Sequence, residues 1–348
     1  MTYYPQLIKD ALSHVRYPGT GEDVVSAGML EDDIRIDGKK ISFSLIFKRA
    51  NDPFAKSLVK ACEQAILTYV DEEAEIKGNI AIKTIAPPPT PKDEPLKEVK
   101  NIIAVSSGKG GVGKSSVAVN LAVALANEGK RVGLLDADIY GPSVPKMLGL
   151  EEARPEGENI DGKDYILPID WNGIKVLSIG FFVDPDKALV WRGAMAVNAL
   201  KQLISDALWG ELDYFIVDMP PGTGDIHLSL VQQLKLTGAI VVTTPQPVAL
   251  ADARKGIDMF TNDHVGVPVL GIVENMAWFT PEELPNNKYY IFGKDGGKAL
   301  AEECGTRLLA QIPLVQGIRE GGDSGLPVAM QPEHPASAYF KALAQSIL

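Results

Sequence analysis

Residues 108–115 read Gly108-Lys109-Gly110-Gly111-Val112-Gly113-Lys114-Ser115, and this glycine-rich stretch indicates the fold of the chain. A short apolar run of strand character, 101–106, precedes it, and an alanine-rich run typical of a helix, 116–126, follows it. Strand, glycine loop and helix in this order form a P-loop, in which backbone N–H groups surround the phosphates of a nucleotide. The stretch therefore predicts a nucleotide-binding site at the start of a helix.

The predicted phosphate site gives individual residues a role. Lys114 supplies a positive charge for the β- and γ-phosphates, and the hydroxyl group of Ser115 is a ligand for Mg²⁺. The helix that begins here directs the positive end of its dipole at the same phosphates. We expect ATP and Mg²⁺ to bind here, with the nucleotide in contact with Gly108, Lys109, Gly110, Gly111, Val112, Gly113, Lys114, Ser115 and Ser116.

Four apolar runs downstream of the P-loop alternate with helical stretches and predict the fold class. The runs are 132–135, 214–217, 239–242 and 269–273. Runs that are apolar on both faces are typical of a parallel sheet covered by helices. We therefore expect residues 100–348 to form one α/β domain, a P-loop NTPase with a doubly wound, mostly parallel sheet.

Residues 1–85 predict a separate, small α+β domain. Helical spacing is present over 5–14 and 54–70, and apolar residues alternate as in two strands on either side of Asp37-Gly38. A stretch rich in proline follows, and proline favours extended backbone that joins neither a helix interior nor a sheet. We expect residues 86–99 to be a linker between the two domains.

Composition restricts the classes of partner and the compartment. The 348 residues carry a formal net charge of −11, which provides no overall attraction to nucleic acid or to anionic lipid. We find no apolar run long enough to span a bilayer, so no membrane partner is expected. The two cysteines, Cys62 and Cys304, lie too far apart to suggest a disulfide framework, which favours a reducing cytoplasm.

Three aspartates stand at or just after the ends of predicted strands. Asp136 and Asp138 follow the run 132–135, and Asp218 follows the run 214–217. Ligands of open α/β sheets bind outside the carboxyl ends of the strands. We expect Asp138 to orient the attacking water, and Asp136 and Asp218 to hold Mg²⁺ together with Ser115. An interpretation in which Asp136 only caps the following turn is equally good.

Other polar residues give weaker signals. Asn275 follows the predicted strand 269–273, where its amide is placed to bond the adenine edge, although turn formation explains it nearly as well. His227 and His264 lack the spacing of metal ligands, so we interpret them as packed or surface residues. The sequence Pro-Pro-Gly-Thr-Gly at 220–224 is typical of a loop that senses the γ-phosphate.

Lys109 is a residue that a plain P-loop does not require. With it, the stretch 109–115 resembles the deviant Walker A motif of the class that contains MinD, ParA and the nitrogenase iron protein. The resemblance implies a homodimer with ATP sandwiched between the subunits, in which Lys109 reaches the nucleotide of the partner. Lys109 would then act with Lys114 and Asp138 in catalysis.

Further stretches resemble the Mrp/ApbC family of iron–sulfur cluster carrier ATPases, and residues 1–85 are similar to the MIP18-type (DUF59) domain often fused to them. These stretches are 136–143, 191–193, 218–225 and 271–276. The resemblance implies a switch that binds iron–sulfur clusters, transfers them to apoproteins or assists their assembly, with apoproteins or assembly proteins as partners. The alternative is a MinD- or ParA-like positioning ATPase that carries no cluster, but the C-terminal stretch 339–348 has a single lysine where a basic lipid-binding helix would need several.

The sequence departs from the family pattern at two places, and the first of them concerns the cluster. Members usually carry a Cys-x-x-Cys pair shortly after the Glu-Asn-Met segment, whereas residues 277–288 contain no cysteine. Four thiolates normally hold such a cluster, and a dimer of this chain offers only Cys62 and Cys304 twice. In the N-terminal domain, Tyr17-Pro18-Gly19 stands where the family tends to have Asp-Pro-Glu. The sequence therefore leaves the cluster ligands unassigned.

Overall fold

The computed structural model describes residues 3–18, 21–47, 52, 54–84, 96–160, 162–182, 193–281, 283–284 and 286–348. The chain divides into two compact units, Met1–Asp93 and Glu94–Leu348, and each unit has its own hydrophobic core. Most of the predicted linker lies outside the described residues, as do Trp191 and Arg192 of the family-like stretch 191–193. The predicted domain limits thus stay a prediction.

The N-terminal unit has two helices and a three-stranded sheet. Its elements are α1 (Pro5–Leu12), β1 (Arg35–Asp37), β2 (Lys40–Phe47), α2 (Ala55–Tyr69) and β3 (Ile80–Thr84). β1 and β2 form the expected hairpin, with Gly38 at a φ of 59°, and β3 lies parallel to β2 at the other edge. The two predicted helices and the hairpin are confirmed, whereas the short, largely exposed β3 was not predicted.

The second unit is built on a twisted eight-stranded sheet. The strand order is β13-β12-β11-β4-β10-β5-β9-β8, and every neighbouring pair is parallel except β8 and β9. The strands are β4 (Val99–Ser106), β5 (Val132–Asp136), β8 (Ile169–Trp171), β9 (Ile174–Ser178), β10 (Leu212–Asp218), β11 (Gly238–Thr243), β12 (Val269–Phe279) and β13 (Leu308–Leu314). A separate hairpin joins β6 (Gly157–Ile160) to β7 (Lys163–Ile166). The predicted α/β fold class is confirmed.

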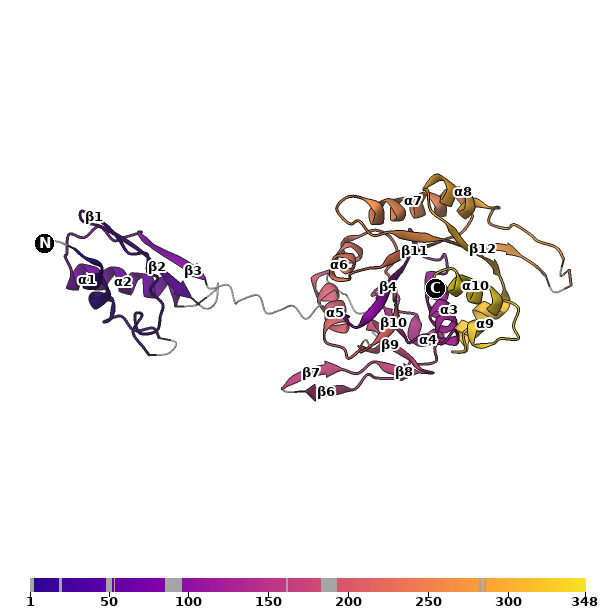
Figure 1. Ribbon diagram of the computed structural model, residues 1–348, viewed down its shortest axis with the longest axis horizontal. Coiled ribbons are helices and arrows are strands. Elements are labelled where there is room, and N and C mark those ends of the chain that lie inside the picture. The colour runs from indigo at the N-terminus through magenta and orange to yellow at the C-terminus, as the bar shows by residue number, and fades with distance from the viewer. Residues whose placement is uncertain are drawn as a thin grey trace. The chain divides into compact units, whose positions relative to one another are not determined.

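Helices cover both faces of this sheet, with α3 and α10 on one face and α7 and α8 on the other (Figure 1). The helices are α3 (Lys114–Asn127), α4 (Val144–Met147), α5 (Gly193–Ser205), α6 (Asp225–Gln233), α7 (Pro247–Thr261), α8 (Gly296–Glu303), α9 (Gln316–Asp323) and α10 (Ser337–Gln345). α3 is buried along its whole length from Val117 to Leu125, since it lies between the sheet and α10. An apolar surface on all sides is what such a position requires. No helix in the described ranges is long and apolar enough to span a membrane.

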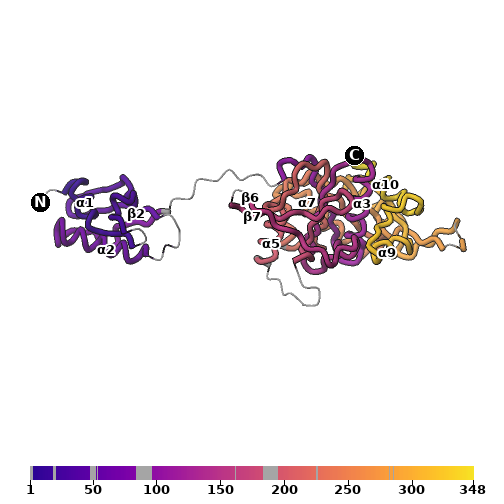
Figure 2. The backbone as a smooth tube through the Cα atoms, turned by 90° about the horizontal axis from the view of Figure 1, so that it is seen from below, coloured from indigo at the N-terminus to yellow at the C-terminus, as the bar shows by residue number. Residues whose placement is uncertain are grey.

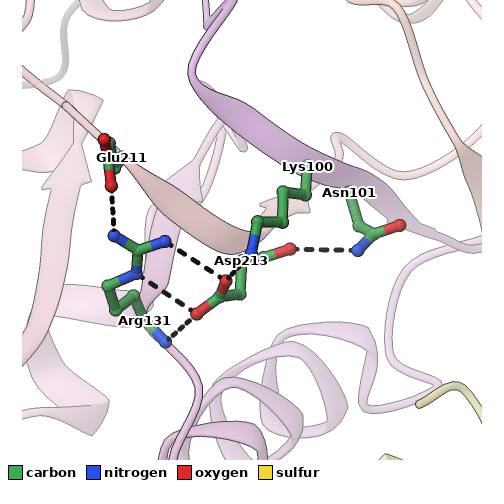
Figure 3. A network of polar contacts seen from close by, with 5 residues as sticks. All are labelled: Lys100, Asn101, Arg131, Glu211 and Asp213. Atoms are coloured by element: carbon green, nitrogen blue, oxygen red, sulfur yellow. Dashed lines mark hydrogen bonds and ion pairs between the residues drawn. The ribbon is translucent and has the colours of Figure 1, made fainter.

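A polar network joins the starting ends of three parallel strands (Figure 3). Asp213 of β10 accepts hydrogen bonds from Arg131, which precedes β5, and pairs with Lys100 of β4 at 2.8 Å. Arg131 also donates to Glu211 at 2.6 Å, and Asn101 donates to the carbonyl oxygen of Asp213 at 3.1 Å. Hydrogen bonds from Arg131 and then from Lys100 hold the pKa of Asp213 well below its usual range. The network fixes the end of the sheet at which these strands begin, opposite to the P-loop.

β12 continues at its carboxyl end into a segment, here called the arm, whose described residues are 277–281, 283–284 and 286–294. The pairing of β12 with β13 shifts between Asn275 and Phe279, where Met276 has a φ of 55°. A left-handed conformation is unfavourable for a residue other than glycine, so it marks a bulge that redirects the strand. Phe279 and Tyr289 exchange backbone hydrogen bonds of 2.9 and 2.8 Å in the arm. Figures 1 and 2 show this segment extending from the body of the second unit.

Candidate functional site

The P-loop lies between β4 and α3 and is fitted closely to its surroundings. Gly111 and Gly113 have φ angles of 82° and 83°, which favour glycine. A Cβ atom on Gly108 would lie 2.2 Å from the backbone of Asp252 in α7, so this glycine permits a close approach of two backbones. At Gly110 and Gly111 an added Cβ would meet nothing within 4 Å, so both glycines border open space.

Lys114 connects the P-loop to the carboxylates at the neighbouring strand ends. Its side chain is 6% exposed and its Nζ forms an ion pair with Asp218. The same Nζ lies 3.6 Å from Oδ2 of Asp138 and 3.2 Å from Oγ of Ser115. The structure thus brings together Lys114, Ser115, Asp138 and Asp218 from three sequence-distant segments, at the carboxyl edge of the sheet.

Asp136 lies beside this group but is held by several hydrogen bonds. Its Oδ2 accepts from the backbone N–H of Val144 at 3.1 Å and from Ser178 Oγ at 2.9 Å, and its Oδ1 accepts from the N–H of Asp138 at 3.1 Å. Burial, and then the charge of Asp218, raise the pKa of Asp136 to about 7. Burial also raises the pKa of Asp138, against the opposing charge of Lys114. The bonds of Asp136 to Asp138 and Val144 fit the turn-capping interpretation.

The donor set at this edge suits Mg²⁺ bound to a nucleotide. Asp218 is fully buried, and its Oδ2 has no hydrogen-bond partner in the described part of the chain. A buried carboxylate oxygen without a partner is costly unless a ligand completes it. Carboxylate and hydroxyl oxygens, as on Asp218 and Ser115, are the ligands that Mg²⁺ prefers. The residues present therefore fit the ion.

Two cavities lie side by side at the P-loop. One of about 200 Å³ is lined by P-loop residues that include Lys109, together with Asp138 and Pro221. The other, of about 380 Å³, lies between α4 and α9. Both include Gly113 and Ser116 in their walls. The second cavity is largely apolar, with Met147, Met276, Pro313, Leu314, Val315 and Ile318 in its lining. Such a wall suits a nucleobase, as the first suits phosphates.

Asn275 contacts the P-loop directly. Its Nδ2 donates to the carbonyl oxygen of Val112 at 2.8 Å, and the side chain also lines the apolar cavity. This hydrogen bond joins β12 to the loop across a sequence separation that no local pattern could predict. The predicted contact of Asn275 with adenine stays a prediction.

The segment after Asp218 is bonded to the strand that carries the P-loop. Met219 N–H donates to the carbonyl oxygen of Val105 at 3.0 Å, and Gly222 N–H donates to that of Ser107 at 2.9 Å. His227, in the first turn of α6, lies 3.3 Å through Nε2 from Oγ of Ser106. The sequence predicted His227 to be a packed or surface residue without a role in the site. Its position three residues after the glycine-rich loop was the available signal.

The two cysteines lie apart from this site. Cys62 is fully buried in the N-terminal unit, and burial raises the pKa of its thiol to about 12. Cys304 is half-buried at the end of α8, and burial raises its thiol pKa as well. Both are free thiols, and a raised pKa disfavours the thiolate that binds metal. Among the described residues, no group of three or more His, Cys, Asp or Glu side chains is arranged to hold a metal ion.

Comparison with known proteins gives matches to both units. A family described as NUBPL iron-transfer P-loop NTPases matches residues 98–348, and a family described as iron–sulfur cluster assembly proteins matches residues 5–77. An iron–sulfur cluster carrier protein of Synechocystis sp. is 45% identical over 338 residues, which cover 97% of this chain and 94% of the relative.

Two solved structures resemble about seven tenths of the chain. The nucleotide-binding protein of Archaeoglobus fulgidus in complex with ADP has a TM-score of 0.60 and 36% identity, covering 70% of this chain and 92% of that one. The cell division ATPase MinD of Pyrococcus furiosus has a TM-score of 0.52 and 26% identity, covering 71% and 98%. Both structures have the P-loop NTPase fold predicted for this chain.

Proposed function

The chain belongs to the ParA-type family of NUBPL iron-transfer P-loop NTPases, and we propose that it is an ATP-hydrolysing switch that binds iron–sulfur clusters or passes them to apoproteins. Its predicted membership of an iron–sulfur carrier family of the MinD/ParA class is confirmed. The observation that carries the ATPase part of the proposal is the meeting of Lys114, Asp138 and Asp218 beside an open P-loop.

Each residue of the site has a distinct task in this proposal. The P-loop N–H groups and Lys114 bind the β- and γ-phosphates of ATP, and Ser115 and Asp218 hold Mg²⁺. The ion, when bound, neutralises charge on the phosphate oxygens. Asp138, 13% exposed and open to the phosphate cavity, orients the attacking water. Asp136 supports this arrangement because its carboxylate accepts a hydrogen bond from the N–H of Asp138. Its predicted contact with Mg²⁺ stays part of the proposal.

A second copy of the chain completes the proposed site. Several large apolar side chains are exposed on segments that follow the carboxyl ends of the strands, where the P-loop also lies: Tyr140, Phe182, Val248, Leu284, Tyr289, Tyr290 and Ile291. Exposed apolar surface around a binding site is typical of an interface. Lys109 lines the phosphate cavity, and within the described part of the chain its Nζ has no ion-pair partner. These features support a homodimer in which Lys109 acts on the nucleotide of the partner.

Mixing two inactive variants tests this function and its geometry together. We expect Lys109→Ala and Lys114→Ala each to abolish ATP turnover when measured alone. In a mixed dimer, the Lys109→Ala subunit keeps its own Lys114 and receives Lys109 from the Lys114→Ala subunit. An equimolar mixture then recovers about a quarter of wild-type turnover, because about half of the dimers are mixed and each has one complete site.

Three outcomes separate the parts of the proposal. No recovery on mixing, with both single variants inactive, would place Lys109 in its own subunit's site and overturn the trans arrangement. Wild-type protein without Mg²⁺-dependent ATP turnover would overturn the ATPase. The His264→Gln variant, which changes an exposed turn residue, serves as the control. Mixing it with wild-type protein should leave ATP turnover unchanged.

The cargo is proposed from the relatives, which are named as iron–sulfur cluster carriers. Anaerobic reconstitution with iron and sulfide tests it: we expect a cluster absorbance and transfer to an apoprotein. Cys304→Ala and Cys62→Ala, measured in parallel, identify which thiol takes part. Absence of both cluster absorbance and transfer in the wild-type chain would remove the carrier role and leave the ATPase. A reducing cytoplasm, in keeping with two free thiols, stays the predicted compartment.

The alternative of a MinD-like membrane-positioning ATPase receives no support from the C-terminal helix. α10 packs Phe340, Leu343 and Ala344 into the core, and it contacts α3. A helix whose apolar face is buried in its own domain has none left for a lipid surface.

A further inference from the structure

Buried polar atoms without regular hydrogen bonds are concentrated in one segment of the second unit. In the described ranges, the buried side-chain atoms without a hydrogen bond of regular geometry are Asp218 Oδ2, His227 Nδ1 and Gln233 Oε1. All three lie between the end of β10 and the end of α6, that is, on Asp218, the loop after it and the helix after that. Buried polar atoms of this kind are rare in folded proteins, and each needs an explanation.

Asp218 holds the metal in the proposed mechanism, whereas His227 and Gln233 have no task in it. Of these two, His227 contacts the strand that leads into the P-loop. It is 1% exposed, and its Nε2 lies 3.3 Å from Oγ of Ser106, which is the last residue of β4. Its ring also packs edge-on against Phe260 of α7, with ring centroids 5.6 Å apart. His227 therefore fixes the first turn of α6 to the rigid strand from which the P-loop starts, two residues before Gly108.

The loop that His227 restrains is the one expected to sense the γ-phosphate. Residues 219–224 connect Asp218 to α6, and they are bonded to the same stretch of chain through Met219 to Val105 and Gly222 to Ser107. Burial lowers the pKa of His227 to about 4, against the opposing effect of a hydrogen bond with the backbone of Pro220 in this loop. The ring is therefore neutral near pH 7, with one nitrogen as donor and the other as acceptor. A neutral ring can share a hydrogen bond with a serine hydroxyl in either direction.

We propose that His227 is a positioning residue that holds the loop 219–224 against the P-loop strand and thereby sets the rate of ATP hydrolysis rather than the affinity for ATP. This inference rests on the proposed ATPase function. The P-loop binds phosphates through its own backbone, so binding does not need His227. Hydrolysis needs the loop after Asp218 in one position, and a looser anchor lowers the fraction of molecules that have it.

Kinetics of three variants in the full-length chain test the proposal. His227→Phe keeps the ring and its contact with Phe260 but removes both nitrogens, and we expect kcat to fall about tenfold with KM for ATP within about twofold of wild type. His227→Gln restores a polar group near the position of Nε2 and should recover most of the loss. His264→Phe makes the same change at an exposed histidine and should leave kcat and KM unchanged.

Ser106→Ala shows whether His227 acts through the serine. If it does, the losses in kcat from Ser106→Ala and His227→Phe do not add in the double variant, because both remove one interaction. Additive losses, an unchanged kcat in His227→Phe, or a rise in KM equal to the fall in kcat would each overturn the inference. Wild-type protein without ATP turnover would instead overturn the proposed function, so the two failures are distinguishable. Ser106→Ala removes a single oxygen atom and keeps the test decisive if His227→Phe does not fold.

Discussion

Gly113 shows how little freedom the P-loop has at the scale of a single residue. It combines a φ of 83° with a site for Cβ that is 2.2 Å from Nδ2 of Asn275. Asn275 cannot move away without cost, because its amide is buried and bonded to Val112. A methyl group at position 113 therefore displaces the side chain that holds the loop in shape.

Gly113→Ala should weaken ATP binding at least about tenfold, as measured by titration calorimetry. Gly129→Ala is the matched control, since Gly129 has a φ of 77° but an added Cβ there meets nothing within 4 Å. That variant suffers only backbone strain of about 1 kcal/mol and should bind ATP normally. Equal affinity in both variants would contradict the steric explanation.

The burial of His227 predicts a pH dependence of stability. Because its pKa is lowered to about 4 in the folded state, the unfolded chain takes up the proton first as the pH falls. The free energy of unfolding should then decrease by about 1 kcal/mol between pH 7.5 and 5.5, and by about 3 kcal/mol once pH 4 is reached. His227→Phe has no such group, so its urea-unfolding free energy should decrease less over the same interval. Parallel pH curves for the two proteins would show that the histidine is not the cause.

The residues of the candidate site divide into those that local sequence can identify and those that it cannot. The spacing of Gly108 to Ser115 specifies the P-loop by itself, and Asp218 is recognisable because it ends an apolar strand. The contact of Asn275 with Val112, and that of His227 with Ser106, join residues more than a hundred positions apart. Such contacts depend on strand order, which periodicity does not contain.

At the scale of secondary structure, the strands at the centre of the sheet were predictable and those at its edge were not. β5, β10 and β11 are continuous apolar runs because helices cover both of their faces. β8 has no buried residue and β13 has only two, so neither strand is a continuous apolar run. The hairpin of β8 and β9 could nevertheless have been predicted, since Asn-Gly, here Asn172-Gly173, is a strong turn signal in a sequence. Both residues have the positive φ that such a turn requires, 50° and 80°.

The network around Asp213 is an element-scale feature because it joins β4, β5 and β10 (Figure 3). Asp213→Asn should lower the Tm at pH 7, since the lowered pKa of Asp213 means that its charged form stabilises the fold. The difference from wild type should shrink as the pH falls below 3.8, where the unfolded wild-type chain gains a proton. Scanning calorimetry at several pH values measures it.

Glu211→Gln is the control for the network. The side chain of Glu211 is 71% exposed and pairs with Arg131, so its removal should change the Tm little. An equal loss in both variants would mean that general surface charge, and not the position of Asp213, is responsible. ATP turnover should be unaffected in either variant at a temperature where both are folded, because the network lies at the edge opposite to the P-loop.

At the scale of the whole molecule, the two units have separate hydrophobic cores. A chain of residues 96–348 should fold, and its ATP turnover should stay within about twofold of the full-length chain. The full-length Lys114→Ala variant gives the baseline for contaminating activity. A folded but inactive truncated chain would show that the N-terminal unit contributes to hydrolysis, and loss of cluster transfer alone would assign that unit to the apoprotein partner.

Because α3 is buried, nucleotide binding at its first turn should change the rate of amide hydrogen exchange along the helix. The helix begins at Lys114, and its own residues from Val117 to Leu125 are buried in the core. Its amide hydrogens can exchange with deuterium only when the unit opens as a whole. A ligand held at the first turn of this helix shifts that opening equilibrium by mass action. The exchange rate at the centre of α3 should therefore decrease as more of the protein binds ATP, although the residues there lie away from the proposed phosphate site.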